Sequence, residues 1–362
     1  MTGIAVLGTG RIGRMHAENI AAHPRARLAG VYDIHAPAAA EVAAQLGVPQ
    51  FDSVEAVLAS AEVDAVLIAS STATHADLIE QSVAAGKAIL CEKPIDLSLD
   101  RVNACATKIA GTSLPIMLGF VRRFDSGHAG VRKAIESGQI GELHQVTITS
   151  RDPGMAPDAY IEASGGIFRD MTIHDFDMAR FILGEDVTEV SATGSRLVDP
   201  ALMQRCDDYD TVTVVLKTES GKQAIIINSR RAVYGYDQRV EAFGSAGMAI
   251  SENHTENNMR LYGKNHTNQA APLKDFFIER YGDAFASEIT AFVDAVENET
   301  EPAVGFEDGR QALKLAEAAR NAPLVSFQRS LVSQTSLIIA QYESGSRSHC
   351  SYDEHNQLID AI

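Results

Sequence analysis

The first third of the chain alternates short apolar runs, rich in β-branched residues, with longer amphipathic stretches. Strands are predicted at 3–7, 26–32, 65–69, 88–91 and 114–120, and helices at 12–22, 38–46 and 75–85. The alternation is typical of repeated βα units. Because the short runs are apolar nearly throughout, they suit strands of a parallel sheet whose two faces are both covered by helices.

After residue 120 the pattern changes. The later strand-like segments, 143–149, 211–217, 223–229 and 238–242, alternate polar and apolar residues. Such alternation predicts an antiparallel sheet with one face open to solvent. The fold class is therefore α/β, with a first domain at 1–120 and a second at 121–322.

Two helical stretches, 283–297 and 309–319, come late and are expected to pack back against one of the two domains. Residues 323–362 are rich in Ser and Gln and show no clear amphipathic period. We expect them to form an atypical, weakly ordered tail.

Composition narrows the class of protein. The 362 residues, 45% of them hydrophobic, are enough for two cores. The formal net charge of −17 would repel a nucleic-acid backbone or an anionic membrane, so neither is an expected partner. No apolar run approaches the length of about 20 residues that a membrane-spanning helix needs.

Targeting signals and cysteines indicate the compartment. Residues 1–10 lack both a basic leader and a small-residue cleavage site, so no signal peptide is expected. The four cysteines, Cys91, Cys105, Cys206 and Cys350, are far apart and form no Cys-x-x-Cys pair. This spacing favours neither a disulfide framework nor a structural zinc site. The expected location is the cytoplasm.

Three glycines follow the first predicted strand at Gly-x-Gly-x-x-Gly spacing. They are Gly8, Gly10 and Gly13, with Arg11 and Ile12 between them. Glycine allows the tight turn, the approach of a pyrophosphate to the backbone, and close packing of the helix on the strand. The free N–H groups of the helix N-terminus attract phosphate. Taken alone the pattern is weak, but its place between strand and helix predicts a dinucleotide site.

An acidic residue follows the second predicted strand. Asp33 lies twenty residues beyond Gly13, where a carboxylate can accept hydrogen bonds from both ribose hydroxyls of an adenosine. It would repel the 2′-phosphate of NADP, and no arginine follows immediately, so NAD is the predicted cofactor. The alternative is a glycine turn beside a solvated aspartate.

Two further strand ends are expected to border the same crevice, because ligands of open α/β sheets bind beyond the carboxyl ends of the strands. The candidate cofactor-binding residues there are Ser70, Ser71, Thr72, His75, Glu92 and Lys93. Small hydroxyl residues would let the backbone approach the cofactor. The alternative for His75, equally consistent with the sequence, is an ordinary residue at the N-terminus of a helix.

Oxidation of an alcohol by NAD needs a base for the hydroxyl proton and a group that steadies the developing alkoxide. Lys93 is a candidate for the second task. The following residue, Pro94, restricts Lys93 to extended backbone angles and helps to aim its side chain. The alternative is a surface charge.

A candidate base lies on the helix predicted after Gly165 and Gly166. Asp170, His174 and Asp177 have i, i+4, i+7 spacing and are expected to share one helix face. Asp170 would orient the imidazole, and His174 would be the general base near neutral pH. A surface pair is the alternative. No second histidine has ligand spacing, so no metal is predicted.

The glycine turn, the Glu92-Lys93-Pro94 tripeptide and the glycine-led Asp170-x-x-x-His174 helix together resemble the glucose-fructose oxidoreductase / inositol dehydrogenase / rhizopine catabolism (Gfo/Idh/MocA) family. The resemblance covers residues 1–320, approximately. Segments 119–125, 150–153, 164–181 and 234–237 are most similar to the inositol dehydrogenases of that family. Four motifs in the right order make the resemblance specific.

The resemblance implies a Rossmann domain followed by an α/β domain whose open, mostly antiparallel sheet serves in oligomer contacts, giving a homotetramer or a dimer. It implies a catalytic group of Lys93, Asp170 and His174, with His174 as acid/base. The residues that it assigns to the substrate's ring hydroxyls are Arg122, Asp152, Asp177 and Tyr236. The alternative for Arg122 is a solvated charge or an ion pair within the domain. The alternative for Tyr236 is an aromatic residue on a strand, with its hydroxyl in water.

The activity that the resemblance implies is NAD-dependent oxidation of myo-inositol at its axial hydroxyl to 2-keto-myo-inositol. A dehydrogenase of another cyclic polyol or a pyranose, such as scyllo-inositol or glucose, is the first alternative. The second is a non-catalytic NAD-binding sensor. The presence of Lys93, Asp170 and His174 together disfavours the sensor, because a sensor needs no proton-transfer group.

Overall fold

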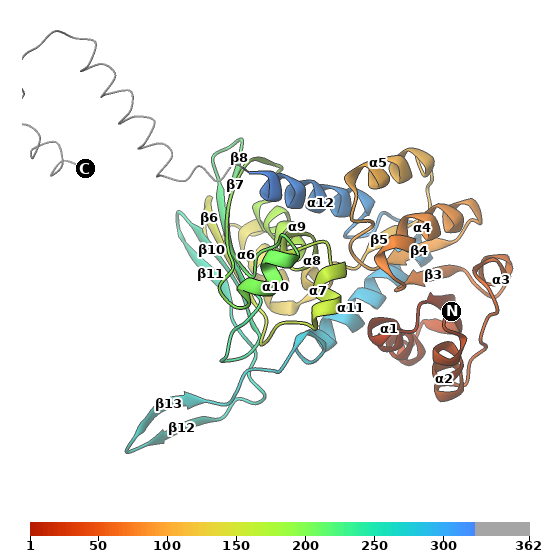
Figure 1. Cartoon of the computed structure of the whole chain (residues 1–362), viewed down its shortest axis with the longest axis horizontal. Helices are drawn as coiled ribbons and strands as arrows, with labels where there is room; N and C mark the ends of the chain where they lie inside the picture. Colours follow the sequence, from red (N-terminus) through yellow and green to blue (C-terminus); the bar gives the residue numbers. More distant parts are fainter. Residues whose placement is uncertain (323–362) are drawn as a thin grey trace, which may run out of the picture. The chain divides into compact units, whose positions relative to one another are not determined.

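The computed structural model describes residues 1–322, which form a five-stranded sheet, a six-stranded sheet and a small two-stranded hairpin (Figure 1). The tail predicted at 323–362 lies outside the described residues. Within 1–322, no helix is both long and apolar enough to cross a membrane.

The N-terminal sheet has the strand order β2-β1-β3-β4-β5, with every neighbouring pair parallel. Its strands are β1 (Thr2–Leu7), β2 (Ala26–Tyr32), β3 (Ala65–Ile68), β4 (Ala88–Cys91) and β5 (Ile116–Leu118). Nearly all of their residues are buried, as their apolar runs predict. Since parallel strands end at one edge, the segments after β1, β2, β3 and β4 are brought to the same side of the sheet.

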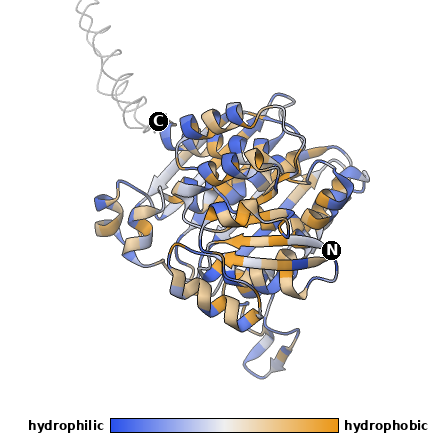
Figure 2. Ribbon diagram, turned by 90° about the vertical axis from the view of Figure 1, so that its right-hand side faces the viewer, coloured by the Kyte–Doolittle hydropathy of each residue, from blue (hydrophilic) through white to orange (hydrophobic). Residues whose placement is uncertain are grey.

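Helices connect and cover these strands. They are α1 (Arg11–Ala22), α2 (Ala36–Leu46), α3 (Val54–Ala59), the 3₁₀ turn η1 (Thr72–Thr74), α4 (His75–Ala84) and α5 (Leu99–Lys108). Figure 2 shows hydrophobic strands lying between helices that carry both hydrophobic and hydrophilic residues. This is the two-sided covering that apolar parallel strands require.

The second sheet has the order β11-β10-β6-β9-β8-β7. Its strands are β6 (Leu143–Arg151), β7 (Val187–Ser195), β8 (Thr211–Thr218), β9 (Gln223–Ser229), β10 (Asp237–Gly244) and β11 (Gly247–Ser251). β6 and β9 are parallel and every other pair is antiparallel. The predicted α/β fold class, with an open and mostly antiparallel second sheet, is confirmed.

One face of this second sheet is covered and the other is open. Contacts from α9 reach β6 and β9, and contacts from α6 reach β10 and β11. The opposite face exposes apolar side chains, among them Phe243 and Met248. The hairpin of β12 (Arg260–Gly263) and β13 (His266–Ala270) projects away from both sheets (Figure 1).

The remaining helices follow the first sheet or close the chain. They are η2 (Val121–Phe124), α6 (Ser126–Glu136), α7 (Asp158–Ala163), α8 (Ile167–Asp170), α9 (Thr172–Leu183), α10 (Pro200–Arg205), α11 (Phe277–Asn298) and α12 (Phe306–Asn321). α11 contacts α1 and η2, and α12 contacts α9 and α5. The two late helices therefore touch both the first and the second part of the chain, rather than one of them. The boundary at 120 stays a prediction.

Candidate active site

A cavity of about 760 Å³ lies where the first sheet's strand ends meet the second part of the chain. The glycine turn contributes Arg11 and Ile12 to its wall, and the segment after β4 contributes Glu92 and Lys93. From the second part come Arg122, Asp152, Asp170, His174 and Tyr236. The three residues predicted to be catalytic thus line one cavity, with three of the four predicted for substrate.

The glycine turn fits a dinucleotide. Gly8 has φ +98°, and a Cβ there would lie 2.6 Å from the backbone of Ala69. A Cβ on Gly13 would lie 1.8 Å from the carbonyl oxygen of Gly8, so the helix packs directly on the turn. Gly10 faces open space and precedes α1, whose N-terminus has no side-chain cap. Its free N–H groups are available to a pyrophosphate.

Asp33 is held in place at the end of β2. Its carboxylate accepts hydrogen bonds from the N–H of Thr9 at 2.7 Å and from the N–H of His35 at 2.8 Å. Burial raises the pKa of Asp33, but the bonds from Thr9 and His35 outweigh burial and leave this pKa below its ordinary value. A half-buried, ionised carboxylate next to the glycine turn suits the ribose hydroxyls of NAD.

The segment after β3 is placed at the same sheet edge, but none of its four predicted cofactor-binding side chains lines the cavity. The Ser70 hydroxyl is 2.7 Å from that of Thr74, and Ser71 and Thr72 begin the η1 turn, so none of these hydroxyls lies in the cavity wall. His75 is 2% exposed, with its ring nitrogens 2.8 Å from the Pro94 carbonyl and 3.0 Å from the Ser70 carbonyl. His75 therefore connects two loops through its ring nitrogens, and its contact with a cofactor stays a prediction.

The segment after β4 supplies two side chains to the cavity wall. Lys93 donates a hydrogen bond through Nζ to the carbonyl oxygen of Asp170 at 2.9 Å. Glu92 Oε1 lies 2.8 Å from Nε2 of His16 on α1. The cation of Lys93 is therefore anchored across the cavity, and the alternative of a surface charge is wrong.

His174 on α9 presents a neutral imidazole to the cavity. Its ring packs edge-on against Phe120, with the centroids 6.1 Å apart. Burial lowers the pKa of His174 well below its ordinary value, and the positive charges of Lys93 and Arg122 lower it further. Within residues 1–322 its buried Nδ1 has no hydrogen-bond partner. A neutral imidazole that lines the cavity can accept a proton from a ligand there.

The predicted Asp170–His174 pair on a continuous helix is wrong. α8 ends at Asp170 and α9 begins at Thr172, with Met171 (φ −97°, ψ −58°) interrupting the helix between them. No hydrogen bond joins Asp170 to His174 among the described contacts. Instead, Asp170 accepts hydrogen bonds from the Tyr160 hydroxyl at 2.7 Å and from Arg230 at 3.0 Å.

Tyr160 and Arg230 are site residues that the sequence reasoning missed. Both line the cavity, and Arg230 is 3% exposed and lies 3.5 Å from Asp208 as well as beside Asp170. Arg230 directly follows the predicted strand 223–229, and a charged residue at a strand end was the available signal. Nothing in the local pattern around Tyr160 points to the cavity.

Three of the residues predicted for substrate binding do line the cavity. Arg122 is buried and forms an ion pair with Asp175 at 2.6 Å, so the ion-pair alternative is correct for it. Burial raises the pKa of Asp152 to about 6, against the opposing effect of Arg122. Tyr236 is 5% exposed and packs edge-on against Phe276, so its hydroxyl does not extend into bulk water.

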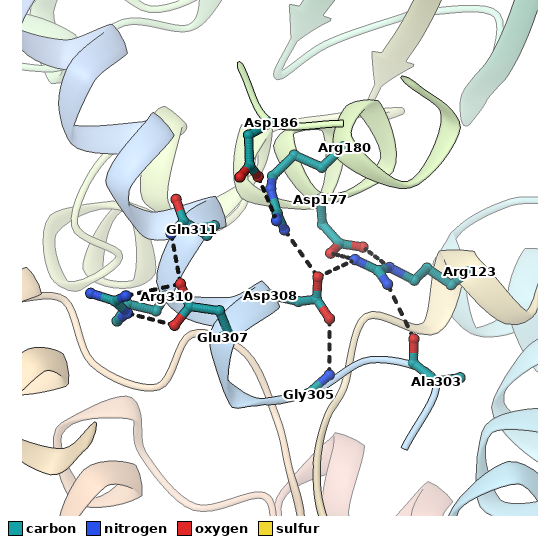
Figure 3. Close-up of polar contacts among 10 residues, drawn as sticks. All are labelled: Arg123, Asp177, Arg180, Asp186, Ala303, Gly305, Glu307, Asp308, Arg310 and Gln311. Atoms are coloured by element: carbon teal, nitrogen blue, oxygen red, sulfur yellow. Dashed lines mark hydrogen bonds and ion pairs between the residues drawn. The ribbon is translucent and has the colours of Figure 1, made fainter. Parts of the chain in front are cut away.

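The fourth, Asp177, is not a cavity residue. Its carboxylate accepts hydrogen bonds from Arg123 at 2.6 and 2.9 Å, as Figure 3 shows, and its side chain is 1% exposed. Arg123 also pairs with Asp308 at 2.9 Å, and Asp308 with Arg180 at 3.0 Å. Asp177 points into this network and is not part of the cavity wall. Its contact with substrate stays a prediction.

Comparisons with known proteins identify the family. Residues 2–120 match the family model described as oxidoreductase family, NAD-binding Rossmann fold, and residues 128–250 match the GFO/IDH/MocA C-terminal domain. The chain is 51% identical over 315 residues to the inositol 2-dehydrogenase of Rhizobium meliloti (strain 1021), covering 87% of this chain and 94% of that one. The chain belongs to the GFO/IDH/MocA family. It is an oxidoreductase with an NAD-binding Rossmann domain, and the predicted family and cofactor are confirmed.

Other members of the GFO/IDH/MocA family are also similar. The scyllo-inositol 2-dehydrogenase (NAD(+)) of Bacillus subtilis (strain 168) is 35% identical over 322 residues, with 88% of this chain and 93% of that one covered. Among solved structures, a putative myo-inositol dehydrogenase from Sinorhizobium meliloti 1021 matches with a TM-score of 0.86 and 49% identity. That match covers 89% of this chain and 97% of the other.

Within the described residues, no group of three or more His, Cys, Asp or Glu side chains is arranged to hold a metal ion. The expected absence of a metal stays a prediction.

Proposed function

We propose that this chain oxidises myo-inositol at its axial hydroxyl to 2-keto-myo-inositol, with NAD as hydride acceptor. The observation that carries the proposal is the convergence of Lys93, Asp170 and His174 in one cavity next to the glycine turn. The 51% identity to an inositol 2-dehydrogenase supports the choice of substrate.

The residues for the cofactor follow from the turn after β1. Gly8, Gly10 and Gly13, with the N–H groups that begin α1, would hold the pyrophosphate, and Asp33 would hold the adenosine ribose. When bound, NAD supplies the acceptor for the hydride.

Proton transfer is assigned to His174. Because its pKa is lowered by burial and by two neighbouring cations, the imidazole is neutral at pH 7 and can take the hydroxyl proton. Lys93 donates a hydrogen bond to the same substrate oxygen, and this stabilises the negative charge that develops there. The carbonyl of Asp170 holds Nζ of Lys93 in the position for this task.

Asp170 acts in this proposal through its neighbours. Its carboxylate is fixed by the Tyr160 hydroxyl and by Arg230. Its backbone carbonyl accepts the hydrogen bond from Nζ of Lys93. Asp170 thus holds Lys93 in the site through its main chain, while its side chain is itself held in place.

Recognition of an uncharged polyol needs hydrogen-bonding groups in fixed positions. Asp152, Arg122 and Tyr236 supply a carboxylate, a guanidinium and a phenol in the cavity wall. A stereoisomer that leaves one of these buried polar groups unpaired is disfavoured, which is how such a site discriminates between hydroxyl configurations.

The experiment that tests the proposal is the initial rate of NADH formation with NAD and myo-inositol, measured beside scyllo-inositol and glucose. A kcat/KM that is highest for myo-inositol supports the proposal. Turnover confined to another polyol keeps the chemistry and rejects the substrate. If NADH binds but no polyol is turned over, the protein is a sensor and the proposal fails.

We expect polyol affinity to depend on Asp152 ionisation. Burial raises its folded pKa to about 6, so the carboxylate that accepts substrate hydrogen bonds is present above pH 6 and lost below it. KM for the polyol should therefore rise as the pH falls through about 6, and the Asp152→Asn variant should show a flat profile. Because the pKa of His174 is lowered well below 6.5, His174 does not titrate in this window.

The same ionisation of Asp152 is expected to change protein stability with pH in the direction opposite to its effect on polyol affinity. A carboxyl whose folded pKa is raised contributes stability below its unfolded pKa of 3.8, and this contribution is lost as the pH rises through about 6. Tighter polyol binding and lower apoprotein stability above pH 6 are expected together. If Asp152→Asn leaves the pH dependence of KM unchanged, Asp152 does not hold substrate.

Cofactor choice is expected to depend on Asp33. Replacing it by Ser removes the charge that repels a 2′-phosphate, and the ratio of kcat/KM for NADP over NAD should rise about tenfold, equivalent to about 1.4 kcal/mol. Steady-state rates with both cofactors measure the ratio. The control is Asp52→Ser, which removes an exposed carboxylate on the loop before α3. A ratio that moves equally in both variants would contradict the assignment.

The chain is further proposed to form a homotetramer or a dimer in the cytoplasm. The open face of the second sheet, where Phe243 is 49% and Met248 is 54% exposed, supports self-association. Size-exclusion chromatography with light scattering decides the number of subunits, and a monomer at micromolar concentration would reject the oligomer.

A further inference from the structure

Helices α1 and α11 lie side by side and run in the same direction. His16 on α1 packs edge-on against Phe285 on α11, with the centroids 5.5 Å apart. Further along, the Nε2 atom of His23 lies 3.2 Å from the Thr290 hydroxyl. Both helices begin near the cavity, because Arg11 stacks over the Phe277 ring at 5.2 Å. The contact between the two helices therefore begins at the cavity wall, which includes Arg11 and Phe277.

Two polar side chains are buried within this contact. His16 is 1% exposed and Glu288 is fully buried, and Glu288 lies one turn after Phe285 on the same face of α11. His16 Nε2 lies 2.8 Å from Glu92 Oε1. In the part of the chain that the structure describes, His16 Nδ1 and both carboxyl oxygens of Glu288 have no hydrogen-bond partner. Buried polar atoms left without a partner are costly, by about 1–3 kcal/mol each.

The protonation states of these groups are complementary. Burial raises the pKa of Glu288 well above its ordinary value, and the negative charge of Glu92 raises it further, so both effects favour the neutral acid. The charged group that acts on Glu288 is Glu92 from the segment after β4, and His16 on α1 packs against Phe285, one turn before Glu288 on α11. A neutral carboxylic acid donates one O–H, and an imidazole that donates Nε2–H to Glu92 has a free acceptor at Nδ1.

We propose that Glu288, His16 and Glu92 form a hydrogen-bonded chain, Glu288 O–H to His16 Nδ1 and His16 Nε2–H to Glu92 Oε1. Rotation of the Glu288 side chain makes the first of these bonds. Glu288 and His16 are then positioning residues that hold Glu92 as a carboxylate in the cavity wall. The proposal rests on the NAD-dependent function proposed above, and extends it to residues that touch neither cofactor nor substrate.

The second carboxylate oxygen of Glu92, Oε2, lies in the cavity wall, where it can act on a bound ligand. A Cβ on Gly119 would lie 3.0 Å from Glu92 Oε2, and both residues line the cavity beside Lys93. A carboxylate in this wall attracts the positively charged ring of NAD more than the neutral ring of NADH. The chain from Glu288 thus favours binding of the oxidised cofactor.

The first test reads the His16 ring directly. Nitrogen-15 spectra of the imidazoles in the apoprotein are recorded for wild type, Glu288→Gln and Glu288→Leu, and the His16→Gln variant assigns the signal among the eleven histidines. We expect a protonated Nε2 and a hydrogen-bonded Nδ1 in wild type. Gln, which keeps an N–H donor, retains the Nδ1 signal, and Leu shifts it toward a free acceptor. An unchanged signal in Glu288→Leu would overturn the proposal.

The second test compares Kd for NAD and NADH by calorimetry. Glu92→Gln should lower the preference for NAD by about tenfold, roughly the effect of one nearby charge at a partly screened distance. Glu288→Leu should lower the preference in the same direction, and Glu288→Gln should leave it within about twofold of wild type. If Glu288→Gln loses the preference as fully as Glu92→Gln, Glu288 acts as an ionised group and the proposal fails.

Two further points concern the folding of the Glu288 variants and the independence of these tests from polyol turnover. If Glu288→Leu does not fold, wild type and Glu288→Gln are compared as the pH rises. The His16 signal should then change in wild type, where Glu288 ionises, and persist in Glu288→Gln. A change in both variants at the same pH would overturn the chain. Neither readout uses a polyol, so failure of myo-inositol turnover leaves these outcomes intact.

Discussion

Replacing His174 by glutamine is expected to lower kcat for polyol oxidation by about 10²–10⁴-fold, the range that general acid–base catalysis contributes. Glutamine keeps a polar side chain of similar reach but takes no proton at pH 7. The imidazole of His174 is kept neutral by burial and by the charges of Lys93 and Arg122, and it is therefore ready to act as a base.

The measurement is the steady-state rate of NADH formation, with Kd for NADH measured alongside by fluorescence. NADH affinity should stay within about twofold of wild type, because in the proposal His174 handles the substrate proton and not the cofactor. His144→Gln, at an exposed position on β6, is the matched control and should keep full activity. A loss of less than about tenfold in the His174 variant would remove it from the role of base.

The second large effect is on stability. Asp177→Ala is expected to lower the free energy of unfolding by about 3–5 kcal/mol, because removing one partner leaves a buried charge uncompensated. The Arg123 side chain is 9% exposed, and after the substitution it keeps Asp308 and the Ala303 carbonyl as partners. These remaining contacts place the expected loss toward the lower end of the range.

Urea unfolding followed by linear extrapolation measures this loss. The control is Asp186→Ala, which removes a carboxylate whose side chain is 79% exposed and pairs with Arg180 at 3.1 Å (Figure 3). That change should cost less than about 1 kcal/mol, as surface ion pairs do. KM for the polyol should be nearly unchanged in Asp177→Ala. A raised KM with unchanged stability would instead support Asp177 as a substrate ligand.

Elements with a strong local signal were predicted well from the sequence. The strands at 26–32 and 88–91 have the observed bounds, because an apolar run covered on both faces has sharp polar ends. The edge strand β7 (Val187–Ser195) was missed, since none of its side chains is fully buried and its alternation, from Val190 on, is carried by small residues. Periodicity reports burial, so an element with little burial leaves little pattern.

The candidate site was predicted in part. The glycine turn and Asp33 could be located because a strand, a tight turn and a helix follow one another in the chain, and the geometry of that unit is local. Lys93 and His174 were recognised by motif, yet no spacing along the chain states that they line one cavity. Tyr160 and Arg230 were missed because their contact with Asp170 joins separate segments.

The sequence by itself determined the α/β class, the family, the NAD site and the residue types needed to oxidise an alcohol. Each of these depends on neighbours within one βα unit or on a short motif. Tertiary structure decided which polar groups meet. In the fold the helix is interrupted at Met171, and Asp177 pairs with Arg123. His75 bonds the Pro94 carbonyl, and Glu288 is buried on α11. Burial and charge pairing depend on segments distant in the chain, and these contacts set the pKa values and the orientation of the site.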